Sequence, residues 1–283
     1  MSFANKIGFM QGRFTSLVNG KIQAFPWMHW QEEFVLASRY GFGLMEWTLD
    51  QEHLARNPLM TDAGFKEIKQ LIDDHGVTVP SLTGDCFMQS PFYKVAGHER
   101  AHLLNDLEDI VLACARLGIK LILIPLVDNG RLENKRQEED LLQGMEHIFS
   151  VLEKTGVVIS FESDFTPHKL ARFISRLDSR YFGITYDIGN SAAFGYLPQD
   201  EISAYGGRIV NVHVKDRILG GSTVPLGKGS ANIPAVVHLL LENGYCGNFI
   251  LQTARATNND HAGSLCFYRD MLLGWLNDHV SDG

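Results

Sequence analysis

Three residues with metal-binding side chains, Glu162, Asp187 and His213, each end a short apolar run of the sequence. They are separated by about 25 residues each time, the length of one strand plus a crossover helix and its loops. If the three runs are parallel neighbouring strands, their last side chains converge at one end of a sheet. Two carboxylates and an imidazole suit a hard or borderline divalent metal ion. The alternative is that each residue is an ordinary polar cap on its strand.

Apolar runs of strand length alternate with segments of helical periodicity along the whole chain of 283 residues. Strands are expected at 6–10, 44–47, 77–82, 120–125, 157–162, 181–187, 208–213 and 248–252. Helices are expected at 30–40, 62–75, 99–117, 137–154, between 162 and 181, at 233–242 and at 260–276. Strict alternation predicts right-handed βαβ units and a parallel sheet. Eight such units favour an α/β fold with one closed (β/α)8 TIM barrel, a single domain over residues 1–283, rather than an open sheet.

In such a barrel the functional residues lie at the carboxyl ends of the strands. Gln252 ends the eighth expected strand and Glu46 ends the second, so both are expected on the same rim as the three metal-binding residues. Lys215 follows His213 by two positions and leaves the strand on the same side. A glycine-rich loop at 219–229 follows and is expected to be mobile and to close over the pocket. No G-x-G-x-x-G follows the first strand and no G-x-x-x-x-G-K-[ST] occurs, so nucleotide cofactors have no motif support.

The composition narrows the class of protein. A net charge of −8 argues against a non-specific nucleic-acid partner, which favours a basic face. No apolar run is long enough to cross a membrane, and no signal peptide is apparent. The four cysteines are scattered and include no C-x-x-C pair, which indicates a reducing compartment. We therefore expect a cytoplasmic protein without nucleic-acid or membrane partners.

Several segments together resemble one known family, the xylose isomerase-like barrel superfamily of sugar phosphate isomerases and epimerases. They are IGFMQGR at 7–13, MEW at 45–47, FE at 161–162, YDIGN at 186–190, HVKDR at 213–217 and VPLGKG at 224–229. The resemblance covers essentially the whole chain. It implies a divalent metal, namely manganese, magnesium, cobalt or zinc, at the ends of strands five to eight. On that pattern the metal ligands are Glu162, Asp187, His213 and, at the end of strand eight, Gln252.

Two positions depart from the pattern of the family's 3-epimerases. Those enzymes have a second glutamate at the end of strand eight, which binds metal and moves a proton, and here that residue is Gln252. They also have a histidine three residues after the aspartate, and here it is Asn190. The endonucleases of the superfamily use several more histidines, and this chain does not reproduce that set. An amide can offer its oxygen to a metal but does not titrate, so a two-carboxylate epimerase is placed in doubt.

Proton transfer at a carbon beside a carbonyl requires a metal that polarises the carbonyl and a base that removes the proton. Glu162 could serve as both ligand and base, because a carboxylate has two oxygens, and Lys215 is the second catalytic candidate. Arg13, Arg217 and Lys215 could bind a phosphate or carboxylate of the substrate. Asn190 is assigned to substrate binding, and Glu46 either binds substrate hydroxyls or forms a structural ion pair.

These residues favour a metal-dependent isomerase or epimerase that acts on a sugar or sugar phosphate. One alternative is a lyase, such as an inosose-type dehydratase, on the same scaffold. Another is a barrel that has lost catalysis and binds a sugar. The partner is then a small sugar molecule, and the chain is expected to form a homodimer or homotetramer.

Overall fold

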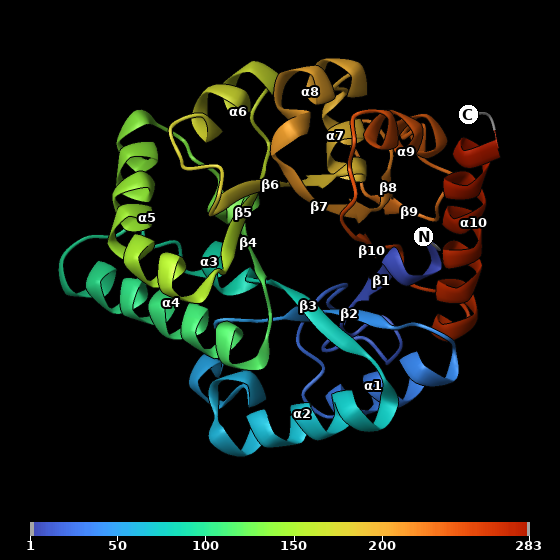
Figure 1. The fold of residues 1–283 in the computed structure, drawn as a ribbon, viewed down its shortest axis with the longest axis horizontal. Helices are drawn as coiled ribbons and strands as arrows, with labels where there is room; N and C mark the ends of the chain where they lie inside the picture. Colours follow the sequence, from blue (N-terminus) through green and yellow to red (C-terminus); the bar gives the residue numbers. More distant parts are fainter. Residues whose placement is uncertain (1–2, 282–283) are drawn as a thin grey trace.

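The computed structural model describes residues 3–281, with side chains through residue 278. Eight parallel strands close into a barrel at the centre of the molecule, in the order β1-β10-β7-β6-β5-β4-β3-β2 (Figure 1). The strands are β1 (Ile7–Met10), β2 (Leu44–Thr48), β3 (Thr78–Thr83), β4 (Leu121–Leu126), β5 (Val158–Ser163), β6 (Phe182–Asp187), β7 (Ile209–Val214) and β10 (Phe249–Leu251). The (β/α)8 fold expected from the alternation is therefore confirmed, and each strand lies within two residues of its expected bounds.

Helices surround the barrel as an outer ring (Figure 1). The longer ones are α1 (Trp30–Arg39), α2 (Asp62–His75), α4 (Gly97–Leu117), α5 (Lys135–Thr155), α6 (Pro167–Ile174), α8 (Pro198–Tyr205), α9 (Ile233–Glu242) and α10 (His261–Ser281). Two short helices, α3 (Asp85–Gln89) and α7 (Ile188–Phe194), directly follow strands at the carboxyl rim. Short 3-10 turns complete the connections: η1 (Phe3–Lys6), η2 (Leu54–Arg56), η3 (Pro58–Met60), η4 (Asp128–Gly130) and η5 (Gly206–Arg208).

Helix α5 shows how local sequence sets these boundaries. Its apolar residues recur at helical spacing and are buried against the barrel. The Asn134 side chain accepts a hydrogen bond from the Gln137 backbone amide at 3.0 Å, which satisfies one of the free amides of the first turn. Gly156 ends the helix at a φ of 68°, a left-handed conformation that glycine adopts without a Cβ penalty.

Pro80 lies within β3, where a proline would remove a hydrogen bond from the barrel ladder. The structure resolves this problem with an irregularity: the register shifts between the pairs Leu44–Thr78 and Glu46–Ser81. Pro80 falls in the shifted part, and its carbonyl accepts from the Lys120 amide at 3.0 Å. The shift places Ser81 directly opposite Glu46, and the Ser81 hydroxyl donates a hydrogen bond to the Glu46 carboxylate.

The 219–229 loop is held by contacts at its start and in its second half, and its mobility and its closure over the pocket stay a prediction. Two short strands, β8 (Asp216–Arg217) and β9 (Thr223–Val224), form a hairpin at its start. The buried Asp216 carboxylate then accepts from the backbone amides of Gly227, Gly229 and Ala231 at 2.9, 2.8 and 3.2 Å. A Cβ on Gly229 would overlap the Asp216 carboxylate, so glycine permits this close approach. The second half of the loop is therefore anchored by a buried charge.

Candidate active site

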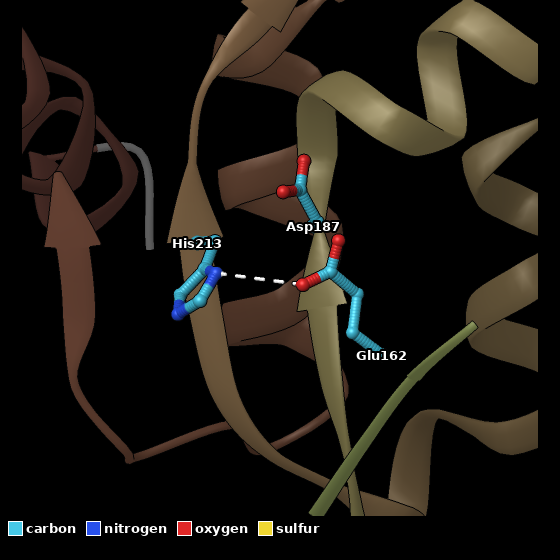
Figure 2. A group of neighbouring side chains, drawn as sticks. All are labelled: Glu162, Asp187 and His213. Carbon is cyan, nitrogen blue, oxygen red and sulfur yellow. Dashed lines mark ion pairs between the residues drawn. The ribbon is translucent and has the colours of Figure 1, made fainter. Parts of the chain in front are cut away.

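Glu162, Asp187 and His213 lie on the neighbouring strands β5, β6 and β7, and all three are buried. Asp187 and His213 are register partners across β6 and β7. Each residue offers one ligand atom, and these atoms all lie within 4.8 Å of one another. His213 Nδ1 is 3.9 Å from Glu162 Oε2, and the two carboxylates stand beside each other at the strand ends (Figure 2). The structure thus brings together the three residues that the strand ends predicted.

The donor set fits a divalent metal ion. His213 Nδ1 is buried and has no hydrogen-bond partner among the described residues. An unsatisfied buried nitrogen costs about 1–3 kcal/mol, which a metal bond would remove. Glu162, Asp187 and His213 would hold such an ion, because their ligand atoms lie within 4.8 Å of one another.

Glu46 lies behind His213 and is fully buried. Its Oε1 accepts from the Thr83 hydroxyl at 2.5 Å and lies 2.7 Å from His213 Nε2. Its Oε2 accepts from the Ser81 hydroxyl at 2.6 Å and the Asn211 amide at 2.9 Å. Both oxygens are engaged and no surface of Glu46 is exposed, so Glu46 forms the structural ion pair with His213 in this structure. A role of Glu46 in substrate binding stays a prediction.

The Glu46–His213 pair sets the chemistry of the imidazole. Burial alone would raise the pKa of Glu46, but the charge and hydrogen bond of His213 outweigh burial and lower it. Burial alone would lower the pKa of His213, and the Glu46 carboxylate raises it instead. When Nδ1 loses its proton, the remaining proton on Nε2 is directed at Glu46 and the Nδ1 lone pair can bind a metal, as histidine ligands require.

Glu162 lies at the floor of a cavity of about 520 Å³. Burial and the nearby Asp187 charge raise the pKa of Glu162 to about 7, opposed by Lys215, His213 and the Asn190 amide. The Asn190 amide donates to Glu162 Oε1, and the Arg217 guanidinium donates to Asn190 Oδ1 at 2.7 Å. Asn190 and Arg217 both line the cavity beside Glu162, as a role in substrate binding requires.

Lys215 and Gln252 line the same cavity. The Lys215 ammonium lies 2.5 Å from Asp187 Oδ2 and donates to Gln252 Oε1 at 2.8 Å. The Gln252 amide nitrogen donates to Gln23 Oε1 at 2.7 Å. The oxygen that Gln252 would offer to a metal is thus bound to Lys215 in this structure, and its role as a fourth ligand stays a prediction.

Arg13 occupies a different place from that expected of a substrate-binding residue. Its guanidinium is buried and donates to the Ile22 carbonyl at 2.7 Å and to Gln23 Oε1 at 3.3 Å. Burial and the neighbouring Arg255 lower the pKa of Arg13 to about 9. Ile22 and Gln23 line the cavity, whereas Arg13 supports them from behind. A substrate contact of Arg13 would need this loop to move.

Among the cavity residues that were not predicted as functional are Gln23 and Asp85. Gln23 lies in a loop without periodicity, and no sequence signal indicates its position. Asp85 follows the third strand at the carboxyl rim, and that position alone was a signal for it.

The fold and the site together define a class of protein, the (β/α)8 barrels with a candidate divalent-metal centre at the carboxyl ends of their strands. The family model described as xylose isomerase-like TIM barrel matches residues 34–269, and the chain belongs to this family. The resemblance inferred from the motifs is confirmed.

Individual relatives agree with this family. An L-ribulose-5-phosphate 3-epimerase UlaE from Escherichia coli O157:H7 is 26% identical over 255 residues, covering 86% of this chain and 88% of the relative. A D-tagatose 3-epimerase-like protein of known structure superposes with a TM-score of 0.74 at 19% identity, over 97% of this chain and 99% of that one. A Mycobacterium smegmatis barrel in complex with magnesium has a TM-score of 0.72 at 15% identity, over 99% of both chains. Within the described part of this chain, no helix is long and apolar enough to cross a membrane.

Proposed function

We propose that the protein is a divalent-metal-dependent epimerase of a keto sugar or sugar phosphate that inverts the carbon next to the carbonyl. The observation that carries the proposal is the buried cluster of Glu162, Asp187 and His213, of which Glu162 lines the cavity, with His213 Nδ1 left without a hydrogen bond among the described residues. The name of the UlaE relative, a 3-epimerase of a ketose phosphate, supports the reaction class.

Glu162, Asp187 and His213 would hold the metal. A bound divalent ion would polarise the substrate carbonyl and the neighbouring hydroxyl, which acidifies the hydrogen on the carbon that carries this hydroxyl. Residues of this chain transfer the protons. Glu162 removes that hydrogen as a proton and returns a proton when the reaction runs in reverse. Asn190 holds the Glu162 carboxylate in place and is itself held by Arg217.

The cavity has the size and polarity of a small-molecule site. Its volume of about 520 Å³ falls within the range of about 300–1,000 Å³ typical of ligand pockets. Three cationic side chains, Arg131, Lys215 and Arg217, line it together with carboxylates and amides. This mixture supports a hydroxyl-rich ligand, with or without a phosphate. Measured turnover of a free ketose and its phosphate would decide between the two.

The proposal is tested with purified protein, MnCl₂ and two probes, L-ribulose 5-phosphate and L-ribulose, in deuterium oxide. We expect loss of the C3 proton signal and appearance of the C3 epimer for at least one probe. His213→Ala should lose bound manganese and all exchange, because the cluster loses its only nitrogen ligand. His147→Ala, an exposed histidine on α5, is the control and should keep both.

Full manganese occupancy in His213→Ala would contradict the metal site. Absence of proton exchange by the metal-loaded wild-type protein with both probes would contradict the epimerase. The same spectra would reveal loss of water from the sugar, the outcome expected of a dehydratase.

A further inference from the structure

Inversion of a carbon centre by proton transfer needs two groups. One removes the proton from one face, and the other delivers a proton to the opposite face. Glu162 can act on one face. Gln252, which lies on the rim of the same cavity, is an amide and cannot deliver a proton. If the proposed epimerase function holds, a different residue of this chain must act on the second face.

Asp85 is a carboxyl group that lines the same cavity without contacting the metal cluster. It is the first residue of α3, immediately after β3, and only 6% of its surface is exposed. The Gln23 amide donates to its Oδ2 at 2.8 Å. The other oxygen, Oδ1, makes no hydrogen bond to a described residue, so it is free to carry a proton.

A chain of hydrogen bonds joins Asp85 to the residue at position 252, and its direction is determined by chemistry. The Lys215 ammonium has only donors, so Gln252 must turn its oxygen toward Lys215 and its nitrogen toward Gln23. Gln23 therefore accepts with its oxygen and donates with its nitrogen to Asp85. Position 252 has no carboxyl group. Through the Gln23 amide, this series of hydrogen bonds leads from Gln252 to the carboxyl group of Asp85.

In the barrel, Asp85 lies on the side of β5 opposite to Asp187 and His213. In the sheet order, β5 with Glu162 is followed on one side by β6 and β7, which carry Asp187 and His213. On the other side β4 and then β3 follow, and Asp85 extends from β3. A sugar held above Glu162 therefore has the metal ligands on one flank and Asp85 on the other.

The surroundings keep Asp85 protonated to an unusually high pH. Burial raises the pKa of Asp85 to about 7. The Gln23 hydrogen bond lowers it, the charges of Asp50 and Glu162 raise it, and Arg13 lowers it. Near neutral pH both the protonated and the ionised forms of Asp85 are thus present. A group that donates a proton in one direction of the reaction and accepts one in the other requires both forms.

We propose that Asp85 is the second proton-transfer group of this site and performs the task that the amide of Gln252 cannot. In one direction Glu162 takes the C3 proton, and the electron pair of the broken C–H bond passes into an enediolate. The Asp85 carboxylic acid then gives its proton to the opposite face of C3, the new C–H bond forms, and the carbonyl is restored. The reverse reaction uses Asp85 as base and Glu162 as acid, and exchange with water resets both groups.

Lys215 is the other cavity residue that could act as an acid. Its ammonium is shared by the Asp187 carboxylate and the Gln252 oxygen, on the metal-ligand flank of Glu162. The Lys215 ammonium is thus engaged by two partners, whereas Asp85 Oδ1 makes no hydrogen bond to a described residue. We therefore assign the second proton transfer to Asp85 rather than to Lys215.

The test compares wild-type protein, Asp85→Asn and a control, Asp73→Asn, which makes the same change on the exposed surface of α2. Each is loaded with manganese and incubated in deuterium oxide, in separate runs, with L-ribulose 5-phosphate and with its C3 epimer. Loss of the C3 proton in the starting sugar and formation of the other epimer are followed by NMR. Manganese content and the thermal unfolding midpoint are recorded for every variant.

Asp85→Asn should lower epimer formation about 10²- to 10⁴-fold in both directions, the usual contribution of a general acid or base. With the epimer that Glu162 deprotonates as substrate, exchange of the C3 proton should persist. With the epimer that Asp85 deprotonates, exchange should fall by the same factor as epimer formation. Manganese binding should be unchanged, because Asp85 is outside the cluster. A merely structural role would reduce exchange from both epimers equally.

Undiminished epimer formation by Asp85→Asn, or equal loss of exchange from both epimers, would overturn the inference while leaving the proposed function intact. A wild-type protein inert toward both epimers would overturn the proposed function and this inference with it. If Asp85→Asn does not fold, an experiment on the wild-type protein tests whether two groups transfer protons. The protein is incubated with C3-deuterated sugar in ordinary water. Two proton-transfer groups give a product with hydrogen at C3. Product that retains the substrate deuteron would show one group acting on both faces.

Discussion

Replacing Glu46 with Gln should weaken metal binding by trapping His213 in the wrong tautomer. The four partners of Glu46 divide between its two oxygens: Thr83 and His213 on Oε1, and Ser81 and Asn211 on Oε2. The Asn211 amide can only donate at its nitrogen, so a glutamine must place its oxygen at the Oε2 position.

The glutamine nitrogen then faces His213 Nε2 and the Thr83 hydroxyl. The hydroxyl can rotate to accept, and the imidazole can accept only by moving its proton from Nε2 to Nδ1. The groups that contact Glu46 then keep a partner, and Nδ1 lacks a hydrogen bond in either tautomer, so the metal-free variant should lose little stability. The proton on Nδ1, however, now occupies the position of the metal.

The loss of affinity combines this tautomer change with the loss of a buried negative charge near the ion. Changes to the partners of metal-bound histidines cost about 10- to 100-fold in affinity. We expect Glu46→Gln to lie at the upper end, about 100-fold or about 2.8 kcal/mol. Isothermal titration with manganese measures the affinity, and nitrogen NMR of the imidazole reports the tautomer.

Glu33→Gln is the matched control, because Glu33 is also a fully buried carboxylate but lies away from the cluster. It accepts from the backbone amides of Gly12, Phe14 and Thr15, none of which can turn to accept. Glu33→Gln should therefore lose about 1–3 kcal/mol of stability and keep its manganese affinity. Wild-type affinity in Glu46→Gln, or an equal loss in both variants, would refute the tautomer argument.

Two further predictions concern Asp85 and Gln252. The pKa of Asp85 is raised to about 7 from an ordinary value of 3.8, so the folded state holds this proton where the unfolded state has released it. Stability of the metal-free protein should therefore fall as pH rises from about 4 to about 7, and Asp85→Asn removes this loss. Its stability relative to wild type should grow by up to about 4 kcal/mol over that range, measured by urea unfolding at pH 4 and pH 8. An equal difference at both pH values would count against the buried acid. Gln252→Glu should tighten manganese binding, because it adds one negative charge beside Lys215 at the cluster, and it should turn the Gln23 amide away from Asp85. Titration calorimetry would contradict this if the affinity were unchanged or weaker.

The sequence by itself determined the barrel and the three residues of the candidate metal site. Helical and strand periodicity are local properties, and they alternate without interruption through the chain. Right-handed crossovers keep consecutive strands parallel and adjacent, so residues that end consecutive strands must meet at one rim. Glu162, Asp187 and His213 end consecutive strands, and their order along the chain was therefore enough to place them together.

Only the tertiary structure decided what surrounds those residues. Glu46 and His213 are on strands β2 and β7, which are not neighbours, and their contact depends on closure of the barrel through the pairing of β1 with β10. The register shift at Pro80 turns Ser81 toward Glu46, and a slip of one residue would reverse every side chain on β3.

Gln23 and Asp85 show the same limit on the cavity side. Gln23 lies in an irregular loop whose path is set by the groups it contacts, among them the buried Arg13. Asp85 was visible as a strand-end carboxyl, but its burial and its bond to Gln23 depend on a loop 62 positions away in the chain. Contacts between residues so distant follow from how the barrel closes and how its loops pack, and no local pattern of residue types encodes them.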